Sequence, residues 1–460
     1  MEFFFKPKGI ALIGASANPN KGGFSILTNL MTGYKGAIYP VNPRYKEIEG
    51  LACYRSVLEV PDPLDLAIVF VPAEATLGTV QDCAERGVSG VMIQSAGFAE
   101  SGDLQGKRLQ DDLKQIRQKT GMRLWGPNCM GLVDAVHGQV YSFVAPSIWD
   151  EGLMAGKVSL IVQSGMLTAG FLIDLMTHGI MGISKACSIG NKVDVDECDL
   201  LQYLIDDQYT ETICLYLESI QNGKRFLEIC RRSNKPIVAL KGGKSEKGAQ
   251  AAMSHTASIA GNRAIVSAAL AQVGVAEAND FMQLMDLGRT LSMYPDAKFP
   301  STGRVAVLTF SGAAGIVSSD FIEHQGLDLS DLSENTKDDL KEIFPEWMPV
   351  SNPVDLWPAI ELNGPEVAWG RAFKAVCADP NVDAVFFHVF VGGFSGKTDI
   401  SSLVKIARAA DKPVFGWLLG KRTEARDFLI QANEMGVPVF REIQRAVECM
   451  AAVFKRSNYL

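Results

Sequence analysis

The sequence predicts an α/β protein with parallel sheets, and three observations support that class. Strand-length apolar runs alternate with helix-length segments, among them GIALIG (9–14), LDLAIVFVP (64–72) and GVSGVMIQS (87–95). Continuous apolar runs of this length are typical of strands buried on both faces, as in parallel sheets. Small or turn-forming residues follow each run. Two later segments also begin alike, GKVSLIVQSG (156–165) and GRVAVLTFSG (303–312).

The composition provides material for about three domains. The 460 residues are 47% hydrophobic and 21% charged, and the net charge of -8 disfavours a role in binding nucleic acid or anionic membranes. Backbone dipoles can still bind anionic ligands in an acidic protein. Nine cysteines without a Cys-x-x-Cys pair indicate free thiols in a reducing compartment, and we expect no metal ligands in this chain.

The sequence also predicts a cytoplasmic location. The apolar start MEFFFKPKG is too short for the hydrophobic part of a signal peptide. No run reaches the roughly 18 apolar residues that span a bilayer.

Two connectors divide the chain into three expected domains. One is the Pro- and Trp-containing stretch APSIWDEGLMAG, and the other is MYPDAKFPSTG, which has two prolines. The expected domains are residues 1–143, 150–295 and 300–460.

The second and third domains share further landmarks after their common opening. In the same order, GNKVD (190–194), TICLYLES (212–219) and NKPIVALKGGKSEKG (234–248) match SNPVD (351–355), DAVFFHVF (383–390) and DKPVFGWLLGKRTEA (411–425). This order favours an internal duplication. The alternative is the strand–glycine–helix rhythm that any two α/β domains share. Only the first copy carries a histidine, His255, after its Lys-Pro strand.

The loop GASANPNKGG, after the first strand, has the composition of a phosphate-binding turn. Its backbone N–H groups and the following helix N-terminus could face a phosphate. The dinucleotide fingerprint fails because residue 16 is Ser rather than Gly. The second strand ends with Asn42, Arg44 and Lys46 rather than an acid, which disfavours NAD. A nucleotide other than NAD and a turn that only closes the βα unit both remain open.

The segment LKGGKSEKG contains Gly-Lys-Ser, the end of the P-loop motif. The first glycine of that motif would fall at position 238, which is Val238, so the motif is absent. A basic, glycine-rich loop that leads to His255 remains.

Ser164-Gly165 and Ser311-Gly312 each follow a buried strand and precede a helix rich in small residues. Each pair could present bare amides at a helix N-terminus, or could simply allow tight strand–helix packing. If the duplicated domains are related by a pseudo-twofold axis, the two helix ends could hold one phosphate between them.

His255 lies in the small-residue run AAMSHTASIAG. A lone histidine is usually structural. Here, small neighbours would leave room for a phosphate, and Ser254 and Thr256 supply hydroxyl donors. A neutral imidazole accepts a phosphoryl group well if a carboxylate holds its other N–H. Glu218, at the end of a predicted strand, is the candidate carboxylate, and an ordinary exposed acid is the alternative.

Taken together, the motifs resemble the NDP-forming acyl-CoA synthetases, the family of succinyl-CoA synthetase and the ADP-forming acetate–CoA ligases. The resemblance covers nearly the whole chain and rests on several segments in the family's order: GASANPNKGG, YPVNPRYKEIEG, VPAEAT, QSAGFAESG, GPNCMG, VQSGMLTAG, LESIQNG and SHTASIAG. It implies a Rossmann-like CoA-binding domain followed by two flavodoxin-like ligase domains.

The resemblance also implies roles for individual residues. His255 would be the phosphohistidine and Glu218 its orienting carboxylate, and Cys129 would lie near the thiol end of CoA. The phosphate-binding residues would be Ser164, Gly165, Ser254, Thr256, Ser311 and Gly312. The CoA-binding residues would be Gly14, Ser16, Lys21, Gly22, Asn42, Arg44, Lys46, Val71, Pro72, Ser95 and Asn128, with the choice between Arg44 and Lys46 for the CoA phosphates left open.

The resemblance implies partners as well. The family phosphorylates its histidine with an ATP-grasp domain, and the three expected domains account for all 460 residues. We therefore expect an alpha subunit that works with a separate ATP-grasp beta subunit carrying ATP or ADP and Mg²⁺, in a hetero-oligomer. The expected reaction joins a small carboxylic acid to coenzyme A through an acyl phosphate. The alternatives are a CoA-binding regulatory paralogue without ligase activity and an NAD(P)-dependent oxidoreductase.

Overall fold

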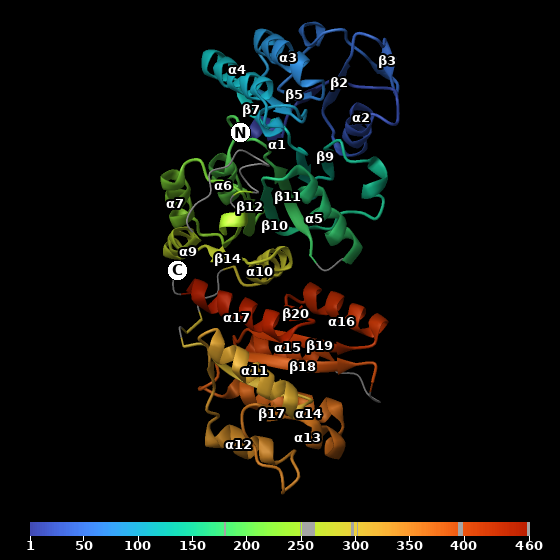
Figure 1. Cartoon of the computed structure of the whole chain (residues 1–460). Coiled ribbons are helices and arrows are strands. Elements are labelled where there is room, and N and C mark those ends of the chain that lie inside the picture. Colours follow the sequence, from blue (N-terminus) through green and yellow to red (C-terminus); the bar gives the residue numbers. More distant parts are fainter. Residues whose placement is uncertain are drawn as a thin grey trace. The chain divides into compact units, whose positions relative to one another are not determined.

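The computed structural model describes residues 1–178, 181–248, 250, 263–295, 299–300, 302–393 and 399–457. The chain forms two compact units, Met1–Leu284 and Met285–Leu460, and the helix α10 (Phe281–Met293) contains the boundary between them (Figure 1). Both units consist of helices packed on mainly parallel sheets, so the predicted α/β class is confirmed.

The first sheet of unit 1 has five parallel strands in the order β2-β1-β5-β6-β7. Every residue of β1, β5 and β6 is buried, which explains their continuous apolar sequences. The strands are β1 (Gly9–Ile13), β2 (Ala37–Val41), β5 (Leu66–Val69), β6 (Gly90–Ile93) and β7 (Arg123–Trp125). The accompanying elements are α1 (Glu2–Phe5), α2 (Gly22–Gly33), the hairpin β3 (Glu47–Ile48) and β4 (Leu51–Ala52), η1 (Val57–Glu59), α3 (Ala73–Arg86), η2 (Ala99–Ser101) and α4 (Leu104–Thr120).

The second sheet of unit 1 has the order β14-β13-β12-β10-β11-β8-β9. Its strands are β8 (Leu132–Asp134), β9 (Gln139–Tyr141), β10 (Ala155–Val162), β11 (Ile183–Ser188), β12 (Thr212–Leu217), β13 (Ile237–Lys241) and β14 (Ala276–Glu277). Its helical segments are η3 (Pro146–Trp149), α5 (Gly165–His178), α6 (Glu197–Asp206), α7 (Gly223–Arg232) and α9 (Arg263–Gln272).

The hairpin β8–β9 pairs antiparallel with β11, so it belongs to the second sheet although the sequence places it before the expected boundary at 143. Lys185 of β11 is 2% exposed, and its Nζ lies 2.8 Å from Asp207 Oδ2 and 3.8 Å from Asp134 Oδ2. This buried group of charges ties the hairpin to the second sheet. The expected boundaries between domains otherwise stay predictions.

Unit 2 contains one parallel sheet in the order β16-β15-β18-β19-β20, with β17 also paired to β15. Its strands are β15 (Arg304–Thr309), β16 (Asp328–Leu329), β17 (Val354–Asp355), β18 (Ala384–Val391), β19 (Val414–Gly420) and β20 (Val439–Phe440). Its helices are α11 (Gly312–His324), α12 (Glu334–Lys341), α13 (Trp357–Asn363), α14 (Pro365–Ala378), α15 (Ile400–Ala409), α16 (Arg422–Glu434) and α17 (Ile443–Ser457).

The strand registers align the two copies of the expected duplication residue by residue. Val158 of β10 pairs with Thr212, and Val305 of β15 pairs with Ala384. The shared openings match Val158 with Val305, so Thr212 corresponds to Ala384. The register therefore differs by one residue from the alignment of 212–219 with 383–390, in which Thr212 would match Asp383. The parallel strands of all three sheets follow the same flavodoxin-like order, so sheet order alone does not separate duplication from a shared rhythm.

The two sheets of unit 1 share one hydrophobic core. The amino-terminal phenylalanines lie in it: Phe5 stacks on Tyr203 of α6 with ring centroids 3.8 Å apart, and Phe4 contacts Trp125 of β7 at 5.3 Å. Phe4 and Phe5 are almost completely buried. The apolar start of the chain is therefore part of the folded core.

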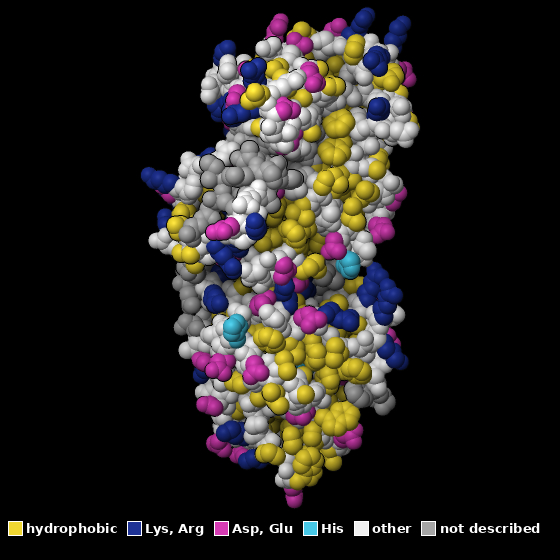
Figure 2. All heavy atoms as spheres, viewed as in Figure 1, with side chains coloured by type: hydrophobic (Ala, Val, Ile, Leu, Met, Phe, Trp, Pro, Cys, Tyr) yellow, Lys and Arg dark blue, Asp and Glu magenta, His cyan; other side chains and the backbone are white. Residues whose placement is uncertain are grey.

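Lys and Arg side chains are interspersed with Asp and Glu over the face shown in Figure 2. That face lacks the single-sign field that nucleic-acid binding requires. Among the described residues, no helix combines the length and the apolar character needed to cross a bilayer.

We expect Gly14→Ala to destabilise the protein more than Gly87→Ala does. Both glycines have positive φ, but an ideal Cβ at Gly14 would lie 2.1 Å from the Phe70 carbonyl oxygen, and one at Gly87 would meet nothing within 4 Å. Placing an alanine at positive φ costs about 1 kcal/mol at either position. The clash of the new Cβ with the Phe70 carbonyl adds about 2 kcal/mol at Gly14. Urea unfolding of the two variants measures the difference, and equal losses would contradict the close approach.

Candidate active site

The predicted CoA-binding residues gather at the carboxyl edge of the first sheet. Parallel strands end at the same edge of a sheet, and ligands of α/β proteins bind there. Gly14 and Ser16 follow β1, and Asn42 follows β2. Val71 and Pro72 come after β5, Ser95 after β6 and Asn128 after β7. The structure thus brings together residues that are more than 110 positions apart in the chain.

Two chain segments approach closely where the strand order reverses, between β1 and β5. The φ of Gly14 is 97°, and its Cα faces the Phe70 carbonyl. A side chain at Gly22 would meet the Phe70 ring, and one at Gly23 would lie 2.1 Å from the Gly14 oxygen. The glycine-rich loop therefore lets the N-terminus of α2 pack directly on the end of β1, with the predicted Lys21 as its N-cap residue.

The polar side chains after β1 and β2 have local partners. Ser16 Oγ accepts the Asn18 N–H at 3.0 Å. Asn42 donates to the Ala15 oxygen at 2.7 Å and accepts the Arg44 N–H at 2.9 Å, so it joins the two strand ends. Arg44 and Lys46 are exposed, and either cation is available to a phosphate.

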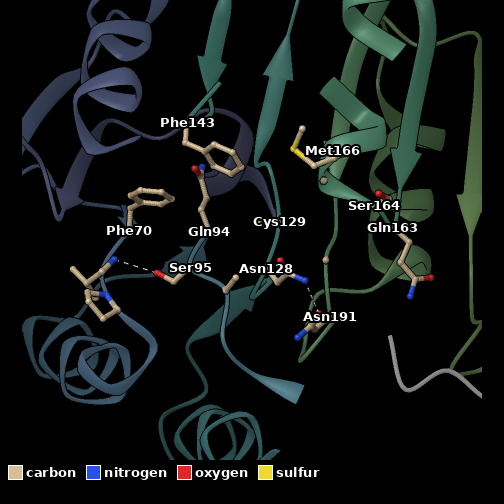
Figure 3. A pocket seen from close by; sticks show the side chains of 15 residues that line it. Phe70, Gln94, Ser95, Asn128, Cys129, Phe143, Gln163, Ser164, Met166 and Asn191 are labelled. Carbon is tan, nitrogen blue, oxygen red and sulfur yellow. Dashed lines mark hydrogen bonds between the residues drawn. The ribbon is translucent and has the colours of Figure 1, made fainter. Parts of the chain in front are cut away.

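A cavity of about 560 Å³ opens beside these strand ends in unit 1. On one side the rings of Phe70 and Phe143 stack with centroids 5.6 Å apart, and Asn128 donates to Asn191 at 3.4 Å at the polar end (Figure 3). The lining residues are Phe70, Val71, Pro72, Gln94, Ser95, Ala96, Asn128, Cys129, Phe143, Gln163, Ser164, Gly165, Met166, Gly190 and Asn191.

The start of α5 forms another wall of the same cavity (Figure 3). Ser164 Oγ accepts the Leu167 N–H at 3.4 Å, as an N-cap residue does. An ideal Cβ at Gly165 would lie 3.3 Å from the Met130 nitrogen, so α5 begins next to the turn that follows β7. The first amides of a helix have no partner within it and attract anions. A predicted phosphate-binding turn therefore shares a cavity with predicted CoA-binding residues.

Some predicted residues lie outside the cavity lining, and several lining residues were not predicted. Gly14, Ser16, Lys21, Gly22, Asn42, Arg44 and Lys46 belong to the same sheet edge but do not line the cavity. Phe70, Gln94, Phe143, Gln163, Met166 and Asn191 line it without having been singled out. Gln163 immediately precedes the Ser164-Gly165 turn, and Asn191 lies in the repeated segment GNKVD (190–194). The sequence could therefore have indicated these two residues as candidates.

Cys129, expected near the thiol end of CoA, is 2% exposed, and its Sγ lies 3.4 Å from the Ile93 oxygen. Burial raises the pKa of this thiol to about 12. The side chain is therefore a neutral thiol at physiological pH rather than a nucleophile.

Glu218 follows β12 directly and is 6% exposed. The Tyr216 hydroxyl donates to Glu218 Oε1 at 3.5 Å, and burial, with the nearby Glu218 charge, raises the pKa of Tyr216 to about 12. Gln163 Oε1 accepts the Glu218 N–H at 2.8 Å, and Lys241 Nζ donates to the Glu218 oxygen at 2.6 Å. Glu218 thus carries a buried carboxylate on a backbone held by two side chains, unlike an ordinary exposed loop acid.

Ser311 and Gly312 begin α11 in unit 2, as expected for a helix N-terminus. An ideal Cβ at Gly312 would lie 3.1 Å from Asp355 Oδ2, which places a carboxylate beside this helix end. A carboxylate there satisfies the helix dipole and repels a phosphate. The phosphate role of Ser311 and Gly312 therefore has less support than that of Ser164 and Gly165. His255, Ser254 and Thr256 lie outside the described residues.

Comparison with known proteins identifies both parts of unit 1. Residues 8–135 match the model of a CoA binding domain, and residues 155–291 match that of a succinyl-CoA ligase like flavodoxin domain. This combination defines a class of CoA-dependent ligases, and it confirms the expected order of a CoA-binding domain followed by a flavodoxin-like one.

Full-length relatives place the chain more narrowly. It is 37% identical to the alpha subunit of acetate–CoA ligase [ADP-forming] II from Pyrococcus furiosus, with 99% of this chain and 96% of that protein covered. It is 35% identical to acetate–CoA ligase [ADP-forming] II from Archaeoglobus fulgidus, of which the chain spans 66%. The chain belongs to the family of ADP-forming acetate–CoA ligases, and the predicted resemblance is confirmed.

A solved structure supports the same family. The dinucleotide forming acetyl-coenzyme A synthetase 1 of Ca. Korarchaeum cryptofilum, in complex with phosphate and ADP, matches with a TM-score of 0.86 at 32% identity. The match covers 100% of this chain and 97% of that one.

We expect iodoacetamide to modify Cys53 much faster than Cys129 in the folded protein at pH 8. Cys53 is partly exposed, whereas Cys129 is buried, and roughly 10⁻⁴ of a thiol with a pKa of about 12 is ionised at that pH. Peptide mass spectrometry over time gives both rates, and raising the pH should accelerate any Cys129 modification. Equal modification of the two thiols at pH 8 would contradict the neutral, buried state of Cys129.

Proposed function

We propose that the chain is the alpha subunit of an ADP-forming acyl-CoA synthetase that interconverts acyl-CoA, phosphate and ADP with a carboxylate, CoA and ATP. The single observation that supports it best is the cavity of unit 1. Its walls are the carboxyl edge of a CoA-binding sheet and the N-terminus of α5, so a thioester and a phosphate could meet there. The acid is a small carboxylate, acetate in the first instance.

The chemistry follows three displacements. In the acyl-CoA-consuming direction, a phosphate oxygen attacks the thioester carbonyl, and CoA leaves as its thiolate with an acyl phosphate as product. His255 then attacks the phosphorus of the acyl phosphate, the P–O bond breaks and the carboxylate leaves. The phosphoryl group finally passes to ADP. A covalent relay of this kind splits a three-substrate reaction into separate in-line transfers.

The chain's own groups have distinct tasks in this scheme. The amides at the start of α5 stabilise negative charge on the phosphate without adding a cation to the site. Glu218 accepts the N–H of His255 and keeps the imidazole in the tautomer that attacks. Cys129 contributes a neutral surface beside the reacting thioester. Ser254 and Thr256 complete the proposed phosphate contacts of unit 1.

The nucleotide belongs, in this proposal, to a separate ATP-grasp beta subunit that binds ATP or ADP with Mg²⁺, and the complex is cytoplasmic. The Pyrococcus furiosus relative of nearly equal length is itself named as an alpha subunit.

We expect the chain alone to acquire a radioactive label from acetyl-CoA and [³²P]phosphate, and His255→Ala to abolish that label. Phosphohistidine is the only species of the scheme in which the phosphoryl group is covalently attached to the chain, so the label should be labile in acid and stable in base. Autoradiography after denaturing electrophoresis measures it. A label that survives in His255→Ala would remove His255 from the mechanism. CoA binding by a chain that is never labelled would instead indicate a regulatory paralogue.

We expect Glu218→Gln to slow this labelling by about 100-fold or more while CoA affinity stays near that of the unaltered chain. The variant keeps the shape of the side chain but removes the charge that would hold the imidazole N–H. Quench-flow labelling and calorimetric CoA titration give the two quantities. An equal loss of labelling and CoA affinity would mean that Glu218 has a structural role.

A further inference from the structure

The peptide group of Glu218 is held from both sides by buried side chains. Gln163 Oε1 accepts two backbone N–H groups, that of Glu218 at 2.8 Å and that of Ser219 at 3.1 Å. On the opposite side, Lys241 Nζ donates to the Glu218 carbonyl oxygen at 2.6 Å and to the Gly242 oxygen at 2.5 Å. The backbone from which the Glu218 carboxylate projects is therefore fixed by two side chains from neighbouring strands.

These two side chains lie where apolar residues would usually be expected. Gln163 is 5% exposed and Lys241 is 8% exposed. Burying an amide or an ammonium group costs free energy unless its hydrogen bonds are made, and it is unfavourable relative to a well-packed hydrocarbon side chain. A fold that needed only stability at these positions would be served by apolar residues.

Unit 2 shows that the same fold does use apolar residues there. Val158 corresponds to Val305, so Gln163 corresponds to Phe310. By the strand registers, Glu218 corresponds to Phe390 and Lys241 to Leu418. All three polar positions of unit 1 are thus hydrophobic in unit 2, where the rings of Phe310 and Phe390 contact each other with centroids 5.7 Å apart. The polar set is not a requirement of the sheet.

We propose that Gln163 and Lys241 are positioning residues that orient Glu218 for the phosphoryl transfer to His255. The inference rests on the proposed function and adds two residues to it. Gln163 also directly precedes Ser164, the N-cap residue of α5, and lines the cavity. One side chain therefore links the backbone that carries the carboxylate to the helix end that would bind phosphate.

The test is a double-mutant cycle on the full chain, with the rate of labelling by acetyl-CoA and [³²P]phosphate as readout. Gln163→Met keeps the length of the side chain but removes the acceptor oxygen, and we expect labelling to slow about 10- to 100-fold. In a Glu218→Gln background the same substitution should slow labelling by no more than about twofold, because the group it positions is already lost.

Lys241→Met gives a second, independent cycle that acts on the carbonyl side, so the test survives if Gln163→Met does not fold. We expect the same pattern, a large loss alone and almost none in the Glu218→Gln background. Asn363→Leu is the control for losing such contacts elsewhere: the amide of this exposed residue also holds two backbone groups, the Ile343 oxygen at 2.8 Å and the Ala359 oxygen at 3.1 Å, but it lies in unit 2 and contacts no predicted site residue. It should lower the melting temperature and leave the labelling rate unchanged.

Three results separate the possibilities. If Gln163→Met and Lys241→Met slow labelling strongly in the unaltered chain but hardly at all in the Glu218→Gln background, the positioning role is supported. Losses that multiply in both cycles, or an Asn363→Leu loss as large as that of Gln163→Met, would show that the substitutions act through general stability and would overturn it. An unaltered chain that is never labelled would overturn the proposed function, and this inference with it.

Discussion

The arrangement of unit 1 depends on a hydrophobic core that two parallel sheets share. Phe5 and Tyr203 stack within it, and Trp125 of the first sheet packs on Phe4. Beside this core, α5 begins next to the turn that follows β7: an ideal Cβ at Gly165 would lie 3.3 Å from the Met130 nitrogen. The cavity lies where these two sheets meet: one wall comes from strand ends of the first sheet, and the other from the start of the helix that follows β10 of the second.

Electrostatics at this cavity rely on dipoles more than on formal charge. The chain has a net charge of -8, yet the cavity wall at the start of α5 consists of Ser164, Gly165 and Met166, none of which carries a charge. The buried charges near it are balanced: Lys192 Nζ lies 2.9 Å from Glu197 Oε2 and also donates to the Ser219 oxygen at 2.8 Å. Beside the corresponding helix end of unit 2, by contrast, an ideal Cβ at Gly312 would lie 3.1 Å from Asp355 Oδ2.

The sequence predicted the features that depend on local pattern. Buried parallel strands produce continuous apolar runs, and their ends carry polar or glycine residues, so Gly14, Asn42, Ser95 and Ser164 could be singled out before their positions were known. Features that depend on tertiary contacts could not be predicted in this way. Nothing local indicates that Phe70 stacks on Phe143 or that Asp355 lies beside Gly312. In the sequence, Gln163 is one more polar residue at a strand end. Only the structure shows that it hydrogen-bonds the backbone of Glu218 and Ser219.

The hairpin β8–β9 has a consequence for dividing the chain experimentally. It follows the last strand of the first sheet, but its backbone partner is β11, some fifty residues further on. A fragment that stops at residue 143 would retain Leu132 and Val133, which the intact protein buries, on a two-stranded ribbon with an unpaired edge. Such edges recruit other chains. Isolated CoA-binding fragments should therefore end before the hairpin if they are to stay monodisperse.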